Sequence, residues 1–305
     1  MTRVVEDRRY GYRRLDPIPQ EPWLKEYYES QYYEILRNGK RGMDIHRLLK
    51  GGPNGDKERA WFRSTLYADV HSVLKDYWKG EIRNRRLLDV GCGTGDFLLF
   101  MREKGWKVVG LELSSEARRM TRRRRLNVHA LTVGEFLSQC PAEKGRFDVV
   151  SMFHVLEHLP DPVKILQGVK RLLSPLGVVV VQVPNDFNVL QKAAHRELRG
   201  KPWWVVTPDH INYFDFASLK DLFRRIGLRT FHAQGDFPME LFLLMGRDTN
   251  YVGNPAVGTQ CHFKRIRLES SLPNDLRRTL YCSLAQLGIG RNCLIFGSRR
   301  EDPGR

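Results

Sequence analysis

The sequence predicts an α/β fold built on a doubly wound, mostly parallel sheet. From residue 86 onward, strand and helix patterns alternate, which is typical of a parallel sheet covered by helices. The run RLLDVGCGTGDF at 86–97 has the pattern of an apolar strand, a glycine-rich turn and the start of a helix. Four consecutive valines at 178–181 indicate a strand that is buried on both faces.

The part of the chain before this alternation is predicted to be mainly helical. Residues 1–21 are charged and lack a clear period, and we expect them to form an extended arm. Apolar and aromatic residues recur at helical spacing over 22–37 and again over 57–79. The segment 39–55 between them is rich in glycine and is predicted to be a loop. The tyrosines of the first helix are predicted either to pack on the core or to cover a bound ligand. These tyrosines are Tyr27, Tyr28, Tyr32 and Tyr33.

Seven strands are predicted, with helices between them. In chain order the strands cover 86–90, 107–112, 127–130, 147–152, 177–183, 228–234 and 291–298. Ser114 or Ser115 is placed to cap the helix after the second strand, and Pro160 and Pro162 precede a helix that begins near Val163. We therefore divide the chain into four parts. They are an N-terminal arm and helical cap (1–80), a ligand-binding core (81–237), a helical insertion (238–290) and the final strand of the core (291–298).

Composition limits the class of protein. A chain of 305 residues can bury a full core, and no uninterrupted apolar run is long enough to cross a membrane. The N-terminus lacks the apolar segment of a signal peptide. Five cysteines without C-x-x-C spacing suit a reducing compartment, so we expect a cytoplasmic protein.

The formal net charge of +16 favours anionic partners such as nucleic acid, anionic lipid or phosphorylated small molecules. This charge is most concentrated in the run 118–125, where six of the eight residues are arginine. We interpret the run as the solvated face of a helix, with a partner-binding surface as the alternative.

The glycine-rich turn indicates a cationic ligand rather than a phosphate. Its spacing is G-x-G-x-G at Gly91, Gly93 and Gly95, and carboxylates flank it at Asp89 and Asp96. Two carboxylates beside a pyrophosphate would repel it at a cost of several kcal/mol. S-adenosylmethionine (SAM) carries an ammonium and a sulfonium group and no phosphate, so carboxylates attract it. We therefore predict a SAM site at this turn.

Other residues of this predicted site follow from their places along the chain. Glu112 ends the next predicted strand, where an acid binds ribose hydroxyls in such folds. Cys92 lies inside the turn, and we interpret it as a small filling residue rather than a nucleophile. The predicted cofactor-binding set is Asp89, Gly91, Cys92, Gly93, Gly95, Glu112, Leu113, Phe153 and His154.

With these motifs the chain resembles the class I SAM-dependent methyltransferases, which have a Rossmann-like fold. The run FDVVSMFHVLEHLPDP at 147–162 is similar to the fourth strand and following loop of ubiquinone-biosynthesis-type O-methyltransferases. The run PDHINYF at 208–214 is similar to the Glu-His-x-x-x-Phe segment of sugar C-methyltransferases. The resemblance covers roughly residues 85–237 and the last strand. It implies that SAM donates a methyl group to a small-molecule acceptor, foremost at oxygen, with a sugar carbon as the alternative.

Three histidines are candidate catalytic residues, because methyl transfer often requires a proton to leave the acceptor and histidine titrates near neutral pH. The resemblance to sugar C-methyltransferases implies that His210 is the base and that Asp209 orients it, although that family has glutamate at the latter position. His154 follows the fourth strand and either acts on the acceptor or lines the SAM pocket. His158 either acts on the acceptor or satisfies main-chain groups of its own loop.

The sequence leads us to assign no metal site. His154 and His158 are spaced for one helical face with Glu157 between them, but no third ligand follows at a spacing typical of zinc. Metal-assisted O-methylation is therefore only a minor alternative.

Two further functions stay open beside methylation of a sugar or anionic metabolite. A nucleic-acid methyltransferase is favoured by the charge, but the sequence has no recognisable RNA-binding module and no Asn/Asp-Pro-Pro-Tyr/Phe motif. A non-catalytic SAM-binding protein would use the basic helix as its binding surface.

Overall fold

The computed structural model describes residues 3–39, 42–81 and 84–299. Lys40 and Arg41, which belong to the predicted glycine-rich loop, and the first two residues of the predicted arm lie outside the described residues. The described chain forms two compact units. The first unit comprises 3–19, 156–160 and 181–297, and the second comprises the remainder.

A seven-stranded sheet has the strand order β5-β4-β3-β6-β7-β10-β9. Its strands are β3 (Arg86–Val90), β4 (Lys107–Leu111), β5 (Val128–His129), β6 (Phe147–Phe153), β7 (Leu173–Pro184), β9 (Arg229–Gln234) and β10 (Asn292–Ser298). β3 pairs in parallel with both β4 and β6, and β4 pairs in parallel with β5. The chain leaves β3 toward β4 and returns on its other side at β6, so the strand order reverses beside β3. The predicted α/β fold with a mostly parallel sheet is confirmed.

The central strands are apolar on both faces, so uninterrupted apolar runs in the sequence were sufficient to predict them. Leu87 and Leu88 of β3 and Val149 and Val150 of β6 are fully buried. The four valines of β7 are fully buried as well, as their sequence predicted.

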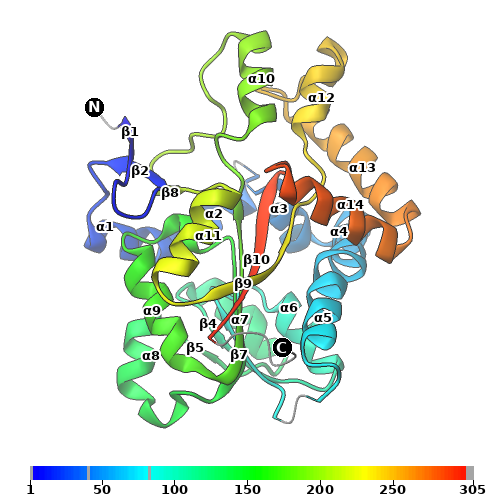
Figure 1. The fold of residues 1–305 in the computed structure, drawn as a ribbon. Helices are drawn as coiled ribbons and strands as arrows, with labels where there is room; N and C mark the ends of the chain where they lie inside the picture. The colour runs from blue at the N-terminus through cyan, green and yellow to red at the C-terminus, as the bar shows by residue number, and fades with distance from the viewer. Residues whose placement is uncertain (1–2, 40–41, 82–83, 300–305) are drawn as a thin grey trace. The chain divides into compact units, whose positions relative to one another are not determined.

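Ten helical segments lead up to and cover the strands of the second unit within the described residues. They are α1 (Glu21–Glu26), the π-helical η1 (Tyr27–Gln31), α2 (Tyr32–Arg37), α3 (Met43–Lys50), α4 (Gly52–Ser64), α5 (Leu66–Tyr77), α6 (Asp96–Glu103), α7 (Ser115–Arg123), α8 (Val133–Gln139) and α9 (Pro162–Leu172), with the short 3₁₀ turn η2 (Pro141–Glu143) besides. Consecutive helices α3, α4 and α5 pack on one another, as do α8 and α9 (Figure 1). Ser114 caps α7 by accepting a hydrogen bond from the main chain of Ala117, as predicted.

The loop predicted over 39–55 is wrong for most of its length, because α3 and the start of α4 occupy it. Only Gly51, with φ of 71°, separates the two helices. Gly55 allows them to approach closely, since a Cβ there would lie 2.6 Å from the carbonyl oxygen of Arg47. Arg47 of α3 also forms a buried ion pair with Glu58 of α4 at 2.7 Å. The glycines therefore mark a tight turn and a close helix contact.

The extended arm predicted over 1–21 is also wrong. β1 (Arg3–Glu6) and β2 (Arg13–Asp16) form an antiparallel hairpin, and β2 pairs with β8 (Asn212–Tyr213) in a three-stranded sheet (Figure 1). The Asp7 carboxylate holds the hairpin turn by accepting hydrogen bonds from the main-chain N–H groups of Arg9 and Tyr10. The partner of β2 comes from a distant segment, which local periodicity cannot reveal.

The other elements of the first unit include five helices. They are α10 (Val189–Leu198), α11 (Phe216–Arg225), α12 (Glu240–Met245), α13 (Pro255–Ser271) and α14 (Asn274–Gln286), with short turns η3 (Leu156–His158) and η4 (Arg247–Thr249). The division into 1–80, 81–237, 238–290 and 291–298 stays a prediction. Among the described residues, no helix combines the length and apolar character needed to cross a membrane.

A buried ionic network anchors helix α13 in the first unit. Arg265 donates hydrogen bonds to Asp236 at 3.0 Å and to Glu269 at 3.2 Å. Tyr281 of α14 donates to the other oxygen of Glu269 at 2.6 Å. Asp236 in turn accepts from the main chain of Asn292 at the start of β10. The two helices and the final strand are thus joined through charged groups.

We expect Glu269→Leu to lower the free energy of unfolding by about 3 kcal/mol, the lower end for breaking a buried ion pair, because Arg265 keeps Asp236. Denaturant titration measures the change. The matched control is Asp275→Asn, whose exposed pair with Arg278 should contribute less than about 0.5 kcal/mol. Equal stability losses in the two variants would contradict the role given to the network.

Candidate functional site

In the glycine-rich turn between β3 and α6, the glycine positions leave little room for a side chain. Gly91, Gly93 and Gly95 all have positive φ, at 68°, 53° and 80°. A Cβ at Gly91 would lie 2.5 Å from a methyl carbon of Val155, and one at Gly95 would lie 2.4 Å from a methyl carbon of Leu126. Both the conformation and the space therefore require glycine.

Glu112 holds this turn to the end of β4. Its Oε2 accepts a hydrogen bond from the main-chain N–H of Gly93 at 2.9 Å, and its Oε1 accepts one from that of Ser114 at 2.8 Å. Burial raises the pKa of Glu112 above its usual value, while these main-chain N–H groups oppose the rise. Because each carboxylate oxygen has two lone pairs, both oxygens can still accept from a ligand hydroxyl.

Asp89 is a buried carboxyl near the end of β3. Ser151 of β6 donates a hydrogen bond to its Oδ1 at 2.7 Å. Burial raises the pKa of Asp89 to about 7; the Ser151 bond opposes the rise and the charge of Glu112 adds to it. A cation bound beside Asp89 would favour its ionised form.

Tyr33 from helix α2 lies against the same turn. Its hydroxyl oxygen is 3.0 Å from the position that a Cβ would take at Gly93. Burial, followed by the charge of Glu112, raises the pKa of this phenol well above its usual value, so it is a neutral hydroxyl at the turn. Spacing along the chain does not distinguish Tyr33 from the other tyrosines of this segment.

The net negative charge around Asp96 is smaller than the sequence predicted, because two arginines pair with it. It forms ion pairs with Arg59 at 3.1 Å and with Arg124 at 3.0 Å. Burial alone would raise its pKa, but the Arg124 charge, the Thr94 bond and Arg59 together lower it. The carboxylate is thus ionised and its charge is balanced by two arginines.

Two arginines of the basic run hold the loops around the glycine-rich turn, so the interpretation of the whole run as a solvated face is wrong for them. Arg118 donates a hydrogen bond to the carbonyl oxygen of Glu112 at 2.9 Å and another to that of Leu113. Arg124 donates to the carbonyl oxygen of Thr94 at 2.9 Å. The arginines of the run that are exposed are Arg119, Arg122, Arg123 and Arg125.

The remaining predicted residues of the turn differ in their surroundings. Cys92 is buried, and its sulfur lies 2.6 Å from where a Cβ would stand at Gly110, which agrees with a filling role. Burial also raises the pKa of its thiol, which disfavours the nucleophilic thiolate. Phe153 packs edge-to-face with Phe97 at a centroid distance of 4.8 Å. His154 is exposed and has a φ of 54°, an uncommon conformation for a residue other than glycine.

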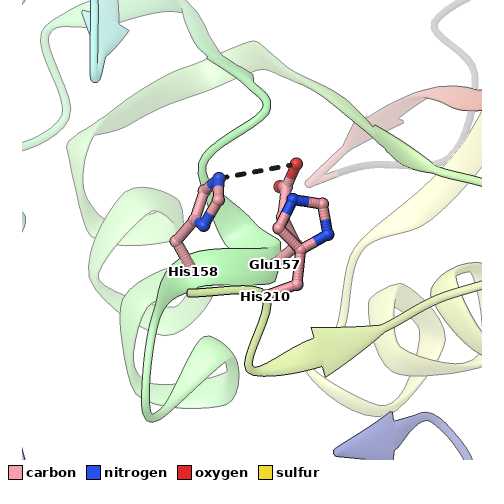
Figure 2. A group of neighbouring side chains, drawn as sticks. All are labelled: Glu157, His158 and His210. Carbon is pink, nitrogen blue, oxygen red and sulfur yellow. Dashed lines mark ion pairs between the residues drawn. The ribbon is translucent and has the colours of Figure 1, made fainter. Parts of the chain in front are cut away.

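A second group of titratable side chains lies in the first unit. Glu157, His158 and His210, which we call the acid–histidine cluster, offer ligand atoms that all lie within 4.8 Å of one another (Figure 2). His158 Nε2 is 3.9 Å from Glu157 Oε1. The two imidazole rings meet edge-to-face, with centroids 4.9 Å apart.

Hydrogen bonds to main-chain carbonyl oxygens join the two segments that carry this cluster. Ile211 N–H donates to the carbonyl oxygen of Glu157 at 2.8 Å. The Asn212 side-chain amide donates to the carbonyl oxygens of Leu156 and Leu159 at 3.2 Å and 2.7 Å. The cluster is therefore placed by one main-chain bond and two side-chain bonds that join η3 and the residue after it to the start of β8.

A further hydrogen bond determines the tautomer of His158. Its Nδ1 lies 2.8 Å from the carbonyl oxygen of Asp209, which can only accept, so Nδ1 carries a proton. The other ring nitrogen, Nε2, faces Glu157 Oε1. Asp186, buried in the same unit, has a pKa well above its usual value because of burial and then the charge of Glu157.

Comparison with known proteins identifies the family. The methyltransferase domain, as a protein family, matches residues 60–233. The chain belongs to the methyltransferase-domain family. The matched part of this methyltransferase chain contains every predicted cofactor-binding residue and the whole acid–histidine cluster. The class of protein predicted from the sequence is confirmed.

Curated relatives match part of this methyltransferase chain. The ubiquinone biosynthesis O-methyltransferase of Pseudomonas aeruginosa is 28% identical over 138 residues, which are 42% of this chain and 58% of the relative. That of Actinobacillus pleuropneumoniae is 34% identical over 160 residues, which are 45% of this chain and 66% of the relative. The chain thus matches less than two thirds of the length of either relative.

Solved structures share the methyltransferase fold. A SAM-dependent methyltransferase from Archaeoglobus fulgidus aligns with a TM-score of 0.53 at 17% identity, over 88% of this chain and all of that one. The 1,6-didemethyltoxoflavin-N1-methyltransferase of Burkholderia thailandensis aligns with a TM-score of 0.52 at 14% identity, over 98% of this chain and 99% of that one. These likenesses concern the fold.

If SAM binds at this turn as predicted, Glu112→Gln should weaken SAM binding about ten- to a hundredfold. The reason is that the variant loses hydrogen bonds to a charged group, which contribute about 1.5–3 kcal/mol. Isothermal titration calorimetry measures the affinity. Glu103→Gln removes an equal charge at an exposed pair in the same unit and should leave it unchanged. A folded Glu112→Gln chain with undiminished SAM affinity would contradict the assignment.

The pKa of about 7 at Asp89 predicts that SAM binding depends on pH. Ionisation of Asp89 as the pH rises creates a negative charge that attracts the cationic donor. SAM affinity should therefore increase, by up to about tenfold, between about pH 6 and about pH 8. Calorimetry across this range should show the rise in the unmodified chain and a much flatter profile in Asp89→Asn. Matching profiles would rule out Asp89 as the group responsible.

Proposed function

We propose that this protein transfers a methyl group from SAM to a small-molecule acceptor, at an oxygen atom. The observation that carries the proposal is the Glu112 carboxylate, which joins Gly93 to Ser114 and whose charge adds to the raised pKa of the buried Asp89. A turn lined by two carboxylates suits a cationic donor and disfavours a pyrophosphate. Membership of the methyltransferase-domain family supports the same reaction.

On the donor side, each group has a distinct proposed role. Glu112 accepts hydrogen bonds from the ribose hydroxyls, and Asp89 attracts the positively charged end of SAM. Gly91, Gly93 and Gly95 allow the ligand to approach the main chain, and Tyr33 presents a hydroxyl over the turn. Cys92 keeps the turn compact. Leu113, Phe153 and His154 complete the proposed donor-binding set.

On the acceptor side, the acid–histidine cluster is proposed to manage the proton that the acceptor hydroxyl loses. His210 is the foremost candidate, with His158 and His154 as the others. The support is that the titratable atoms of Glu157, His158 and His210 all lie within 4.8 Å of one another. The relatives' name, O-methyltransferase, supports oxygen as the methylated atom. Positioning of donor and acceptor supplies the rest of the rate enhancement.

Net charge and cysteine content support the proposed class of acceptor and the proposed location of the protein in the cell. A net charge of +16 supports an anionic metabolite or a sugar that carries phosphate. All five cysteines are free, which supports a reducing cytoplasmic environment. Nucleic acid is the less favoured acceptor.

The proposal is tested by supplying methyl-labelled SAM with nucleotide sugars, glycans and phenols. We expect label to reach at least one acceptor. His210→Gln should lower kcat by a factor of about 10² or more while leaving SAM affinity unchanged, because it acts on the proton rather than on the donor. His71→Gln, on helix α5, is the matched control and should retain activity.

Binding of NAD at the glycine-rich turn, with SAM unable to displace it, would overturn the proposal. So would a chain that binds SAM tightly and labels none of these acceptors.

A further inference from the structure

We propose that the exposed face of helix α7 and the turn after it bind the phosphate backbone of a nucleic acid. Four exposed arginines make up this surface, which we call the arginine face. They are Arg119, Arg122, Arg123 and Arg125. The proposal goes beyond methyl transfer, because none of these four side chains belongs to the proposed donor-binding set.

Helix geometry gathers three of these arginines on one side of α7. Arg122 and Arg123 follow Arg119 by three and four residues, so the three side chains are neighbours on the helix surface. The rise from Arg119 to Arg123 is only about 6 Å along the helix axis. Arg125 lies in the turn directly after the helix. The arginine face is therefore a compact patch of positive charge.

The carboxylates around α7 do not balance this patch. Among the residues that the structure describes, none of the four guanidinium groups forms an ion pair or a hydrogen bond. Glu116, in the first turn of α7, is paired with Arg37. Asp96 is paired with Arg59 and Arg124. Because like charges three or four residues apart destabilise a helix, the unbalanced face favours an anion from outside the chain.

The backbone at Arg125 supports a role for the charge. Arg125 has a φ of 53°, in the left-handed region where glycine is the usual residue after a helix. An arginine is conformationally unfavourable there, which indicates a function for its side chain. The helix dipole favours Arg122 and Arg123, which lie in the last turn of α7. It does not account for Arg119 in the middle of the helix or for Arg125 beyond its end.

The chemistry of the face favours a nucleic acid over a membrane or an acidic protein. Helices that bind lipid surfaces combine basic residues with large apolar ones. Among the described residues, no exposed large hydrophobic side chain belongs to α7 or to the turn after it. Guanidinium groups bind phosphate through paired hydrogen bonds, and a nucleic acid presents phosphates at short, regular intervals. The net charge of +16 is consistent with such a polyanion.

Binding at this face should not depend on base sequence. The residues of α7 include no aromatic side chain that could stack on bases. Arginines that contact phosphates position a nucleic acid without reading it.

The test is fluorescence anisotropy of the full chain with a labelled oligouridylate of about 20 nucleotides, which is longer than a typical single-strand site. Three or four phosphate contacts predict a slope of about −2 to −3 for the logarithm of affinity against the logarithm of salt concentration. Affinity should thus fall about twenty- to fiftyfold between about 50 and about 200 mM NaCl. Arg119→Gln/Arg122→Gln/Arg123→Gln should flatten the slope by about 2 and weaken binding at least about tenfold at the lower salt.

The matched control is Lys107→Gln/Lys164→Gln/Arg171→Gln. It removes the same charge from exposed positions of the same unit outside α7. Its affinity for the oligouridylate should stay within about twofold of the unmodified chain, with the same salt slope. Calorimetry should find unchanged SAM affinity in both triple variants, because Arg118 and Arg124 keep their contacts with the loops around the glycine-rich turn.

Equal binding of the oligouridylate by the two triple variants would overturn the proposal, since net charge alone would then explain the affinity. Failure of the unmodified chain to bind it at the lower salt would do the same. Tighter binding to poly-glutamate would instead assign the face to an acidic protein. Tighter binding to vesicles of phosphatidylglycerol and phosphatidylcholine would assign it to a membrane, and either result would overturn a nucleic-acid partner.

Discussion

The Glu112 carboxylate is the contact on which the glycine-rich turn after β3 depends. One of its oxygens binds the main chain of Gly93 in the turn after β3, and the other binds that of Ser114 after β4. Parallel strands end at the same edge of a sheet, so their following loops need such a tie to keep a fixed spacing. Arg118 strengthens it by holding the carbonyl oxygens of Glu112 and Leu113. The glycines supply only the space and conformation that this tie requires.

Local patterns were sufficient for the strands but not for the chain before them. β3 was predicted at its observed bounds, because its buried residues form one uninterrupted apolar run. The hairpin of β1 and β2 was missed because β2 is stabilised by pairing with β8, far along the chain. The glycines of 39–55 were interpreted as a loop, although Gly51 is a tight turn and Gly55 a close contact between helices. In both cases the deciding contact is tertiary.

The candidate site shows the same limit. The motif placed Gly91, Gly93 and Glu112 together because residue type and spacing encode a turn after one strand and an acid after the next. It could not identify Tyr33, which reaches the turn from a separate helix. Nor could it show that arginines balance Asp96, since one of them lies in a helix that no motif marks.

Buried carboxylates create one electrostatic problem in both units. Beside the glycine-rich turn, Ser151 donates a hydrogen bond to Asp89 and main-chain N–H groups donate to Glu112, yet burial still raises the pKa of both. Each group would therefore gain from a nearby positive charge, which the proposed sulfonium donor would supply. In the first unit, the buried Glu157 faces Nε2 of His158 at 3.9 Å. The charge of Glu157 adds to burial in raising the pKa of the nearby Asp186, so buried carboxylates carry the same electrostatic cost in both units.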